Sequence, residues 1–319
     1  MGKVGIFGDT GMIGQEIGKI LKLHDLVETE FRQNSQRIEG NLGKCDIVFL
    51  ATKEQESLRF APEILAQGTR VVDLSGAYRL KNSSDFEKWY GIKHPNPELM
   101  QEAVYGLPAF YADTIKTARL VANPGCYPTS IILALKPLKG MLQGNVCIVS
   151  TSGISGARRD VEAESNERAY SAGKMHKHVP EIQFYSGFNM NFYPIVIESV
   201  FRGINTNIVA EISDKLKGLP DEQASMQLAA RIKQAYKPED LVTVTANQIG
   251  KYGTRDVNHT HKVVINVQVN DGAVHINSLI DNLLRGAASQ AVENMNLMLG
   301  YSRLHGINRV CIPLPLLPC

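Results

Sequence analysis

One cysteine of this sequence stands where it could act as a nucleophile. Cys126 follows Asn-Pro-Gly and precedes a proline that suits the first turn of a helix, so we expect a helix to begin at Tyr127 or Pro128. A sulfur at a helix N-terminus lies near the positive end of the helix dipole and near free N–H groups, which stabilise a thiolate and can hold an oxyanion. The alternative is a buried cysteine that only packs as a small apolar side chain. The tight turn favours the nucleophile.

A nucleophilic thiol needs an acid–base partner, and the stretch His-Lys-His-Val-Pro-Glu-Ile contains two histidines. In an extended segment alternate side chains share a face, so His176 and His178 would reach one pocket, where Glu181 could orient one of them. The sequence does not decide which histidine handles the proton. His-x-His is also a metal-binding pattern, but we find no cysteine or acidic cluster in the sequence that completes such a site, and we predict no metal.

A glycine-rich turn near the N-terminus is typical of a dinucleotide site. An apolar run that ends at Phe7 is followed by Gly-x-x-Gly-x-x-Gly and then by apolar residues at helical spacing. Glycines let the backbone approach a pyrophosphate, whose charge is stabilised at the helix N-terminus. The alternative is a tight strand–helix turn that binds nothing. The residues that we predict to contact the cofactor here are Gly8, Thr10, Gly11, Met12, Ile13 and Gly14.

The end of the next strand pattern indicates which dinucleotide binds. Arg32 and Ser35 lie near this end, where NAD sites usually carry an acidic residue and NADP sites an arginine. We therefore predict NADP, with Arg32 and Ser35 as contacts. Glu28 and Glu30 would favour NAD instead if the strand ended earlier.

A serine- and glycine-rich loop, Ser150–Arg159, follows a later apolar strand pattern. Such a loop offers N–H groups and hydroxyls to a phosphate or a nicotinamide. The alternative is a flexible connector. The cofactor contacts that we predict in this loop are Ser152, Gly153, Ser155 and Gly156.

Two arginines are candidates for holding an anionic substrate. Arg79 lies in Asp-Leu-Ser-Gly-Ala-Tyr-Arg and Arg202 in Phe-Arg-Gly-Ile, and arginine binds carboxylate and phosphate bidentately. Either arginine could equally belong to a structural ion pair. Asn123 and Glu181 complete the predicted substrate-binding set.

The elements that must position these residues indicate two domains. An apolar strand pattern over 45–52 is followed by a helical pattern over 55–68, and this alternation is typical of a parallel sheet with right-handed crossovers. After residue 121 β patterns dominate, Asn-Asp-Gly at 270–272 predicts a hairpin, and a last helix is expected over 281–300. We predict an α/β Rossmann-type domain over 1–124 and 281–319, and an α+β domain with a mixed, largely antiparallel sheet over 125–280.

Composition and length set further limits. The chain has 319 residues, a net charge of +2, 44% hydrophobic and 21% charged residues, and no basic surplus that would indicate a nucleic-acid partner. Its apolar stretches are too short to span a bilayer, so we expect no membrane partner, and the N-terminus begins with a strand pattern rather than a signal peptide. Five scattered cysteines then favour free thiols in a reducing cytoplasm.

Three further expectations concern residues outside the motifs. Cys45 and Cys147 lie inside apolar strand patterns and are expected to be buried structural residues. His24 and His305 are expected at the surface. The apolar tail 309–319 is expected to dock on the protein surface or on a neighbouring subunit.

Taken in order, the motifs resemble those of the N-acetyl-gamma-glutamyl-phosphate reductases, a family of the wider semialdehyde dehydrogenase group. The resemblance covers nearly the whole chain, including Asn-Pro-Gly-Cys-Tyr-Pro-Thr-Ser, Asp-Leu-Ser-Gly-Ala-Tyr-Arg-Leu, Val-Tyr-Gly-Leu-Pro, Ser-Gly-Ile-Ser-Gly-Ala, His-Lys-His-Val-Pro-Glu-Ile and Arg-Gly-Ile. It implies an NADPH-dependent oxidoreductase of arginine biosynthesis, in which the Cys126 thiolate attacks N-acetylglutamyl phosphate and the resulting thioester is reduced to the semialdehyde. It also implies that the last helix packs on the nucleotide domain, with Asn282 near the nicotinamide.

Two features depart from the family pattern. Members usually carry Pro-His-Leu in the strand before Arg-Gly-Ile, where this chain has Ile195 and Val196 after the proline, and the region between the first helix and Cys45 is compressed. The alternatives are an aspartate-semialdehyde dehydrogenase, which acts on a shorter acyl phosphate, and a non-catalytic NADP-binding sensor without a fast-reacting thiol. A homodimer or homotetramer is expected by analogy with other β-rich second domains.

Overall fold

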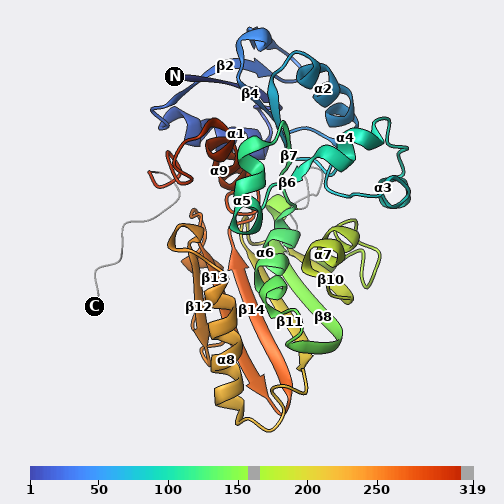
Figure 1. Ribbon diagram of the computed structural model, residues 1–319, viewed down its shortest axis with the longest axis vertical. Helices are drawn as coiled ribbons and strands as arrows, with labels where there is room; N and C mark the ends of the chain where they lie inside the picture. Colours follow the sequence, from blue (N-terminus) through green and yellow to red (C-terminus); the bar gives the residue numbers. More distant parts are fainter. Residues whose placement is uncertain (157–165, 310–319) are drawn as a thin grey trace. The chain divides into compact units, whose positions relative to one another are not determined.

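The structure is a computed structural model that describes residues 1–156 and 166–309 (Figure 1). The described chain forms two compact units, one of Met1–Gly125 with the residues from Ala287 onward, and one of Cys126–Gly286. The sequence placed these divisions at 124/125 and 280/281. The end of the predicted loop Ser150–Arg159, from residue 157 onward, and the apolar tail beyond Arg309, with Cys311 and Cys319, lie outside the described residues.

The first unit is built on a sheet of seven strands in the order β3-β2-β1-β4-β5-β7-β6. All neighbouring strands are parallel except β2 and β3, which form an antiparallel edge. This is the Rossmann-type sheet that the alternating patterns predicted. The strands are β1 Gly2–Phe7, β2 Val27–Gln33, β3 Ile38–Gly40, β4 Ile47–Leu50, β5 Arg70–Asp73, β6 Val104–Tyr105 and β7 Leu120–Ala122.

Helices from both ends of the chain belong to the first unit. They are α1 Met12–Lys22, α2 Glu54–Ala66, α3 Ser83–Tyr90, α4 Pro97–Glu102, α5 Pro108–Thr117 and α9 Ala288–Leu299, with the short 3-10 helix η1 Leu42–Lys44. Helix α9 packs against α1 and α5, and all but one of its residues are buried. The chain therefore completes the core of this unit with a helix that comes after the whole second unit in sequence.

The second unit contains a mixed sheet in the order β12-β13-β14-β11-β8-β10-β9. The pairs β8–β10 and β12–β13 are parallel and the other four are antiparallel. The hairpin predicted at 270–272 joins β13 to β14, and its turn residues Asp271 and Gly272 both have positive φ, as a two-residue hairpin turn requires. The strands are β8 Leu142–Gly153, β9 Glu167–Ala169, β10 Met190–Ile197, β11 Ile204–Ile212, β12 Val242–Ala246, β13 Val263–Asn270 and β14 Ala273–Ile280.

The α-helices of the second unit lie on one face of this sheet: α6 Cys126–Leu135 over β11 and β14, α7 Val179–Ser186 over β10, and α8 Asp221–Gln234 over β12 and β13 (Figure 1). Alternate residues of β8 point to that face, where Val146 and Ile148 are buried. The intervening Cys147 and Val149 are exposed on the other face. The prediction that Cys147 is buried is therefore wrong, because the described residues cover only the other face of its strand, whereas Cys45 is buried as predicted.

The expected helix over 281–300 is shorter in the structure. Asp281 is fully buried, and its carboxylate accepts the backbone N–H groups of Leu283 and Leu284 at 2.9 and 3.0 Å. A side chain that captures nearby N–H groups favours a turn over a helix. Residues 281–286 accordingly form a turn, and α9 begins only at Ala288.

The prediction of a surface position is wrong for His24, which is only 3% exposed. Its Nε2 lies 2.9 Å from Asn296 Oδ1 of α9. His24, Asp25 and His305 are the one group in the described chain whose ligand atoms could converge on a metal ion. Those atoms already engage protein partners, since Asp25 pairs with both His305 and Arg309. Among the described residues, none of the helices combines the length and the apolar composition needed to cross a bilayer.

Candidate active site

Cys126 is the first residue of α6, one or two positions before the expected start of this helix at Tyr127 or Pro128. The residues on either side are buried, but Cys126 itself is partly exposed. Pro128 lies in the first turn, where its missing N–H leaves no intrahelical hydrogen bond unmade. The sulfur is thus carried at the N-terminal end of a ten-residue helix and is open to a reactant, as a nucleophile requires.

The turn over 281–286 packs directly behind this cysteine. A Cβ atom added to Gly286 would lie 2.7 Å from Cys126 Cβ and 2.7 Å from the carbonyl oxygen of Asn282, so only glycine fits. The Asp281 carboxylate also holds the turn in place, because it accepts hydrogen bonds from Arg202 Nη1 at 3.1 Å and from the backbone N–H of His259 at 2.7 Å. The position of Cys126 is therefore set by tertiary packing as well as by its helix.

A cavity of about 610 Å³ opens beside the thiol within the second unit. It brings together the predicted catalytic residues Cys126, His176 and His178. Gly156 of the predicted cofactor-binding loop also lines it. The lining residues are Cys126, Tyr127, Gly156, Arg168, Ala169, Tyr170, His176, Lys177, His178 and Val196.

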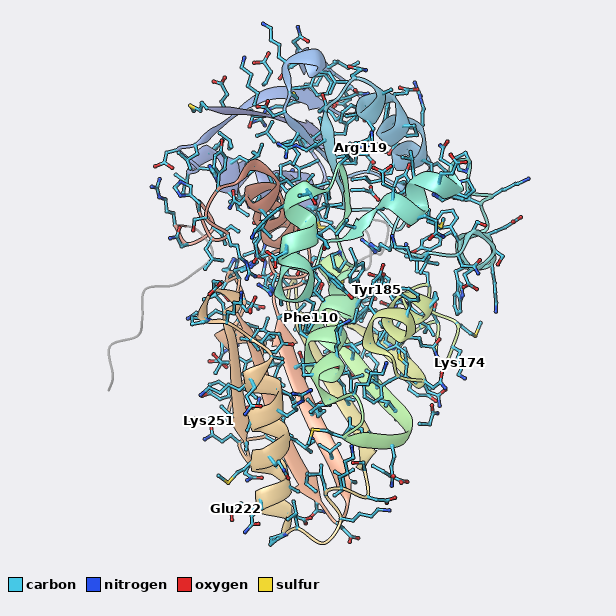
Figure 2. The ribbon with its side chains drawn as sticks, viewed as in Figure 1. Phe110, Arg119, Lys174, Tyr185, Glu222 and Lys251 are labelled. Carbon is cyan, nitrogen blue, oxygen red and sulfur yellow. The ribbon has the colours of Figure 1, made fainter. Side chains whose placement is uncertain are left out.

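The two histidines reach the cavity from a turn, and not from the extended segment that the sequence suggested. His178 precedes α7 with helical backbone angles, and its N–H donates to His176 Nδ1 at 3.1 Å. The imidazole rings lie 4.7 Å apart, and both rings make edge contacts with Tyr127, the neighbour of Cys126. Lys174, labelled in Figure 2, lies on the exposed stretch just before this turn.

Two tyrosines complete the wall near the sulfur. The hydroxyls of Tyr127 and Tyr170 lie 3.2 Å apart. Burial raises the pKa of both phenols, and a negative charge on the nearby Cys126 would raise it further. Both phenols therefore remain protonated at neutral pH and act as neutral hydrogen-bonding groups beside the thiol.

Sequence reasoning missed the positive charges of the cavity. Arg168 extends from β9 and forms an ion pair with Glu198, whose side chain is almost fully buried. Lys177, which lies between the two histidines in the sequence, also lines the cavity. Arg168 could not be selected from sequence because it lies in no motif, and Lys177 was hidden inside the histidine motif as an apparent spacer.

The predicted substrate-binding residues do not line this cavity. Buried Arg79, in the first unit, donates to the carbonyl oxygens of Asn123 and Leu74 at 2.8 and 2.7 Å. Arg202 is buried against Asp281, and Glu181 is fully buried in the first turn of α7. Their assignment to the substrate remains a prediction.

The predicted cofactor-binding loop lies mostly in regular structure. Ser152 and Gly153 end β8, while Ser155 and Gly156 belong to the short 3-10 helix Ile154–Gly156. The predicted contact Asn282 joins this region, since its Nδ2 donates to Ser155 Oγ at 3.0 Å. Asn282 Oδ1 also accepts the backbone N–H of Gly203 at 2.8 Å.

The glycine turn in the first unit fits a dinucleotide. Gly8 has φ +80°, and an added Cβ would overlap the carbonyl oxygen of Ala51. At Gly14 an added Cβ would overlap the Gly8 carbonyl oxygen and lie 2.8 Å from Asp9 Cα. Helix α1 begins after Gly11 without a side-chain cap or an acidic residue in its first turn. Its first N–H groups are therefore suited to a pyrophosphate.

The residues at the end of β2 gather around this turn. Asn34 and Arg37 hold the Asp9 carboxylate at 2.8 and 2.9 Å. Burial alone would raise the pKa of Asp9, but these two hydrogen bonds outweigh burial and lower it. The positive charge of Arg32 contributes to the same shift. Asp9 is thus an ionised carboxylate whose negative charge is balanced by the basic and amide groups around it.

Comparison with known proteins decides the family. The semialdehyde dehydrogenase NAD binding domain matches residues 28–118, and the semialdehyde dehydrogenase dimerisation domain matches residues 126–282. N-acetyl-gamma-glutamyl-phosphate reductase of Clostridium novyi is 34% identical over 96% of this chain and 98% of its own. The protein of the same name from Ectopseudomonas mendocina is 36% identical over 97% of this chain and 99% of its own. The chain belongs to the N-acetyl-gamma-glutamyl-phosphate reductase family.

Solved structures agree with this family at the level of the fold. Aspartate semialdehyde dehydrogenase II of Vibrio cholerae gives a TM-score of 0.69 at 15% identity, covering 94% of this chain and 98% of that one. The aspartate semialdehyde dehydrogenase of Candida albicans, solved with NADP, gives 0.66 at 14% identity, covering 94% and 98%. This N-acetyl-gamma-glutamyl-phosphate reductase family member is an oxidoreductase with a semialdehyde dehydrogenase NAD-binding domain.

Proposed function

We propose that this chain catalyses the NADPH-dependent reduction of N-acetyl-gamma-glutamyl phosphate to N-acetylglutamate semialdehyde and phosphate, a step of arginine biosynthesis. One observation carries the proposal: a partly exposed cysteine at the start of α6 shares a cavity with two histidines, in a chain of this family. We also propose that it works in the cytoplasm, where the thiol stays reduced.

The chain's own residues account for the covalent steps. A histidine of the cavity takes the proton of the Cys126 thiol, and the sulfur adds to the acyl carbon while the carbonyl electron pair moves onto its oxygen. When the carbonyl re-forms, the bond to the phosphate oxygen breaks. The N–H groups at the start of α6 stabilise the oxyanion of the tetrahedral intermediate. Phosphate leaves and a thioester remains on the sulfur. After reduction to the aldehyde level, the oxyanion re-forms the carbonyl as the carbon–sulfur bond breaks. Cys126 departs as a thiolate and takes its proton back from the histidine.

NADPH, when bound, supplies the hydride for this reduction. The residues predicted to hold it are the glycine turn from Gly8 to Gly14, with Arg32 and Ser35 near the 2′-phosphate. The strain-free positive φ of Gly8 and the lack of room for a side chain at Gly14 support a close backbone approach to the pyrophosphate.

The substrate carries a carboxylate and a phosphate, and the cavity offers two cations. Arg168 is half exposed and its ion pair with Glu198 leaves other guanidinium N–H groups available for a carboxylate. Lys177 is partly exposed beside both histidines. We assign these two side chains to the anionic ends of the substrate, in addition to the arginines predicted from sequence.

Reduction of NADP by N-acetylglutamate semialdehyde and phosphate tests the proposal, with aspartate semialdehyde as the competing substrate. We expect turnover with the first aldehyde and a kcat/KM at least about tenfold lower with the second. The converse preference would indicate an aspartate-semialdehyde dehydrogenase. Binding of NADP with no turnover of either aldehyde would indicate the non-catalytic sensor.

Replacing Arg32 with alanine is expected to reduce the preference for NADP over NAD about tenfold or more. Among the described residues no ion pair engages Arg32, and the negative charge of Asp9 is already balanced by its ion pair with Arg37. A 2′-phosphate would therefore meet the positive charge of Arg32 here. A hydrogen bond to a charged group contributes about 1.5–3 kcal/mol, which corresponds to roughly ten- to a hundredfold in affinity. The ratio of kcat/KM for the two cofactors measures this preference.

The control for this variant is Arg119→Ala. Arg119 is an exposed arginine of the same unit, paired with Glu102 and labelled in Figure 2. It should leave the cofactor ratio unchanged. An unchanged ratio in Arg32→Ala as well would place the 2′-phosphate elsewhere.

We further propose that the uncovered face of the second sheet joins two copies of the chain. The matched family model over 126–282 is a dimerisation domain, and this face carries exposed apolar side chains on three adjacent strands. Val149 on β8, Tyr193 on β10 and Val209 on β11 are 38%, 37% and 47% exposed. Covering them would bury apolar area that contributes about 25 cal/mol per Å².

Val149→Lys is therefore expected to halve the mass of the particle in solution, because association would bury the lysine charge of each copy in an apolar interface. Light scattering after size exclusion measures this mass. Met226→Lys on α8, which changes a 57% exposed residue of the helical side, is the control and should leave the mass unchanged. If the control variant dissociates the particle instead, the interface lies on the helical side of the sheet.

A further inference from the structure

The hydrogen bonding of His176 fixes its tautomer. His176 Nδ1 accepts the backbone N–H of His178 at 3.1 Å, so this nitrogen carries no proton. A neutral imidazole has one protonated nitrogen, which in His176 must be Nε2. His176 therefore presents an N–H donor at Nε2 and has no vacant acceptor nitrogen.

The surroundings of His176 keep it neutral. Its side chain is buried, and burial followed by the positive charge of Lys177 lowers its pKa to about 4. The other titratable groups that share its cavity are Cys126, Tyr127, Arg168, Tyr170 and His178. The two tyrosines are protonated and neutral, and Arg168 adds a further positive charge to the cavity. These surroundings oppose a second proton on the ring.

The Nε2–H group is available to a ligand. Among the described residues it has no hydrogen-bond partner. The atom is not shut off from solvent, and the ring lines the cavity beside Cys126. The protein has thus oriented a neutral donor by one backbone hydrogen bond and left its other end to the substrate. A fixed donor of this kind stabilises negative charge that develops in a reaction without transferring a proton.

We propose that His176 donates its Nε2–H to the substrate's reacting carbonyl oxygen, and that His178 alone accepts and returns the proton of the Cys126 thiol. This inference rests on the proposed function, which supplies the carbonyl. It assigns separate roles to two histidines that the sequence could not distinguish. His178 takes the proton role because it is the other histidine that lines the cavity together with Cys126.

The kinetic test compares His176→Gln with His176→Ala. Glutamine can place an amide N–H near the position of Nε2 but cannot titrate, whereas alanine removes the donor. We expect kcat/KM to fall less than about tenfold in the glutamine variant and by about 10²–10³ in the alanine variant, the range for loss of one oxyanion donor. If the wild-type protein is active and both variants lose kcat/KM equally, the inference is overturned.

The pH profile separates the two histidines. The ionisation on the acidic side of the kcat/KM profile should persist in His176→Gln and disappear in His178→Gln, which should also lose about 10²–10⁴ of the rate. Loss of this ionisation in His176→Gln would assign the proton transfer to His176 and overturn the inference. A wild-type protein without reductase activity would instead refute the proposed function.

A third measurement does not depend on activity. In protein with ¹⁵N-labelled histidine, His176 should show an unprotonated Nδ1 and a protonated Nε2 from pH 5 to 8, with its signals assigned by their absence in His176→Gln. Titration of these signals within that range would overturn the inference. Since folded His176 takes up its proton near pH 4 and unfolded histidine near 6.5, stability should fall between these values as pH decreases, and less so in His176→Gln.

Discussion

Cys126→Ser is expected to lower turnover by about 10⁴-fold or more, because a serine hydroxyl in this setting forms no thiolate and the covalent step is lost. NADPH affinity should stay within about twofold of wild type, since the residues that we assign to the cofactor in the glycine turn belong to the other compact unit. Steady-state assays and a fluorescence titration with NADPH measure the two quantities. A Cys126→Ser variant with wild-type turnover would exclude covalent catalysis.

The other cysteines provide the controls for this prediction. Burial raises the pKa of Cys45 to about 12, so this thiol should resist alkylation, whereas the exposed Cys147 is accessible to the reagent. With less than one equivalent of iodoacetamide, peptide mapping should find the label mainly on Cys126. Cys147→Ser should retain activity. Preferential labelling of Cys147 would contradict an activated Cys126.

Gly14→Ala is expected to abolish NADPH binding at micromolar concentration and to lower the melting temperature. The added Cβ overlaps the Gly8 carbonyl oxygen and crowds Asp9 Cα, and both are backbone atoms of the turn. Inserting a methyl group into close-packed structure costs about 1–3 kcal/mol, and here it also displaces the N–H groups assigned to the pyrophosphate. Fluorescence titration and thermal unfolding measure the two effects.

The same helix contains the matched control. Gly18 lies four residues further along α1, and an added Cβ there meets nothing within 4 Å. Alanine has the higher helix propensity, so Gly18→Ala should raise the stability by up to about 1 kcal/mol and leave NADPH binding intact. Equal behaviour of the two variants would show that the turn does not carry the cofactor.

Features set by short-range sequence were predicted well. The Rossmann-type strands, the glycine turn and the start of α6 near Cys126 depend on local apolar periodicity and on glycine or proline placed beside a helix. The β13–β14 hairpin follows in the same way from its turn residues. In each case the residues that determine the structure are neighbours in the chain.

Features set by tertiary contacts were not predicted. Arg168 lines the cavity only through the pairing of β9 with β10. Cys147 is exposed because the described α-helices of its unit cover the opposite face of the sheet. The helix expected to start at Asp281 was replaced by a turn through a carboxylate that binds distant Arg202 and His259. Local patterns contain no information on such partners.

Helix α9 has a consequence for how the protein is made. Its apolar and amide side chains fill the space beside α1 and α5, yet the ribosome reaches it only after translating all of Cys126–Gly286. At about 5–20 residues per second, the nascent N-terminal region waits roughly ten to thirty seconds for this helix. During that interval it exposes the apolar surface that α9 later covers, so we expect chaperones to bind the unfinished chain.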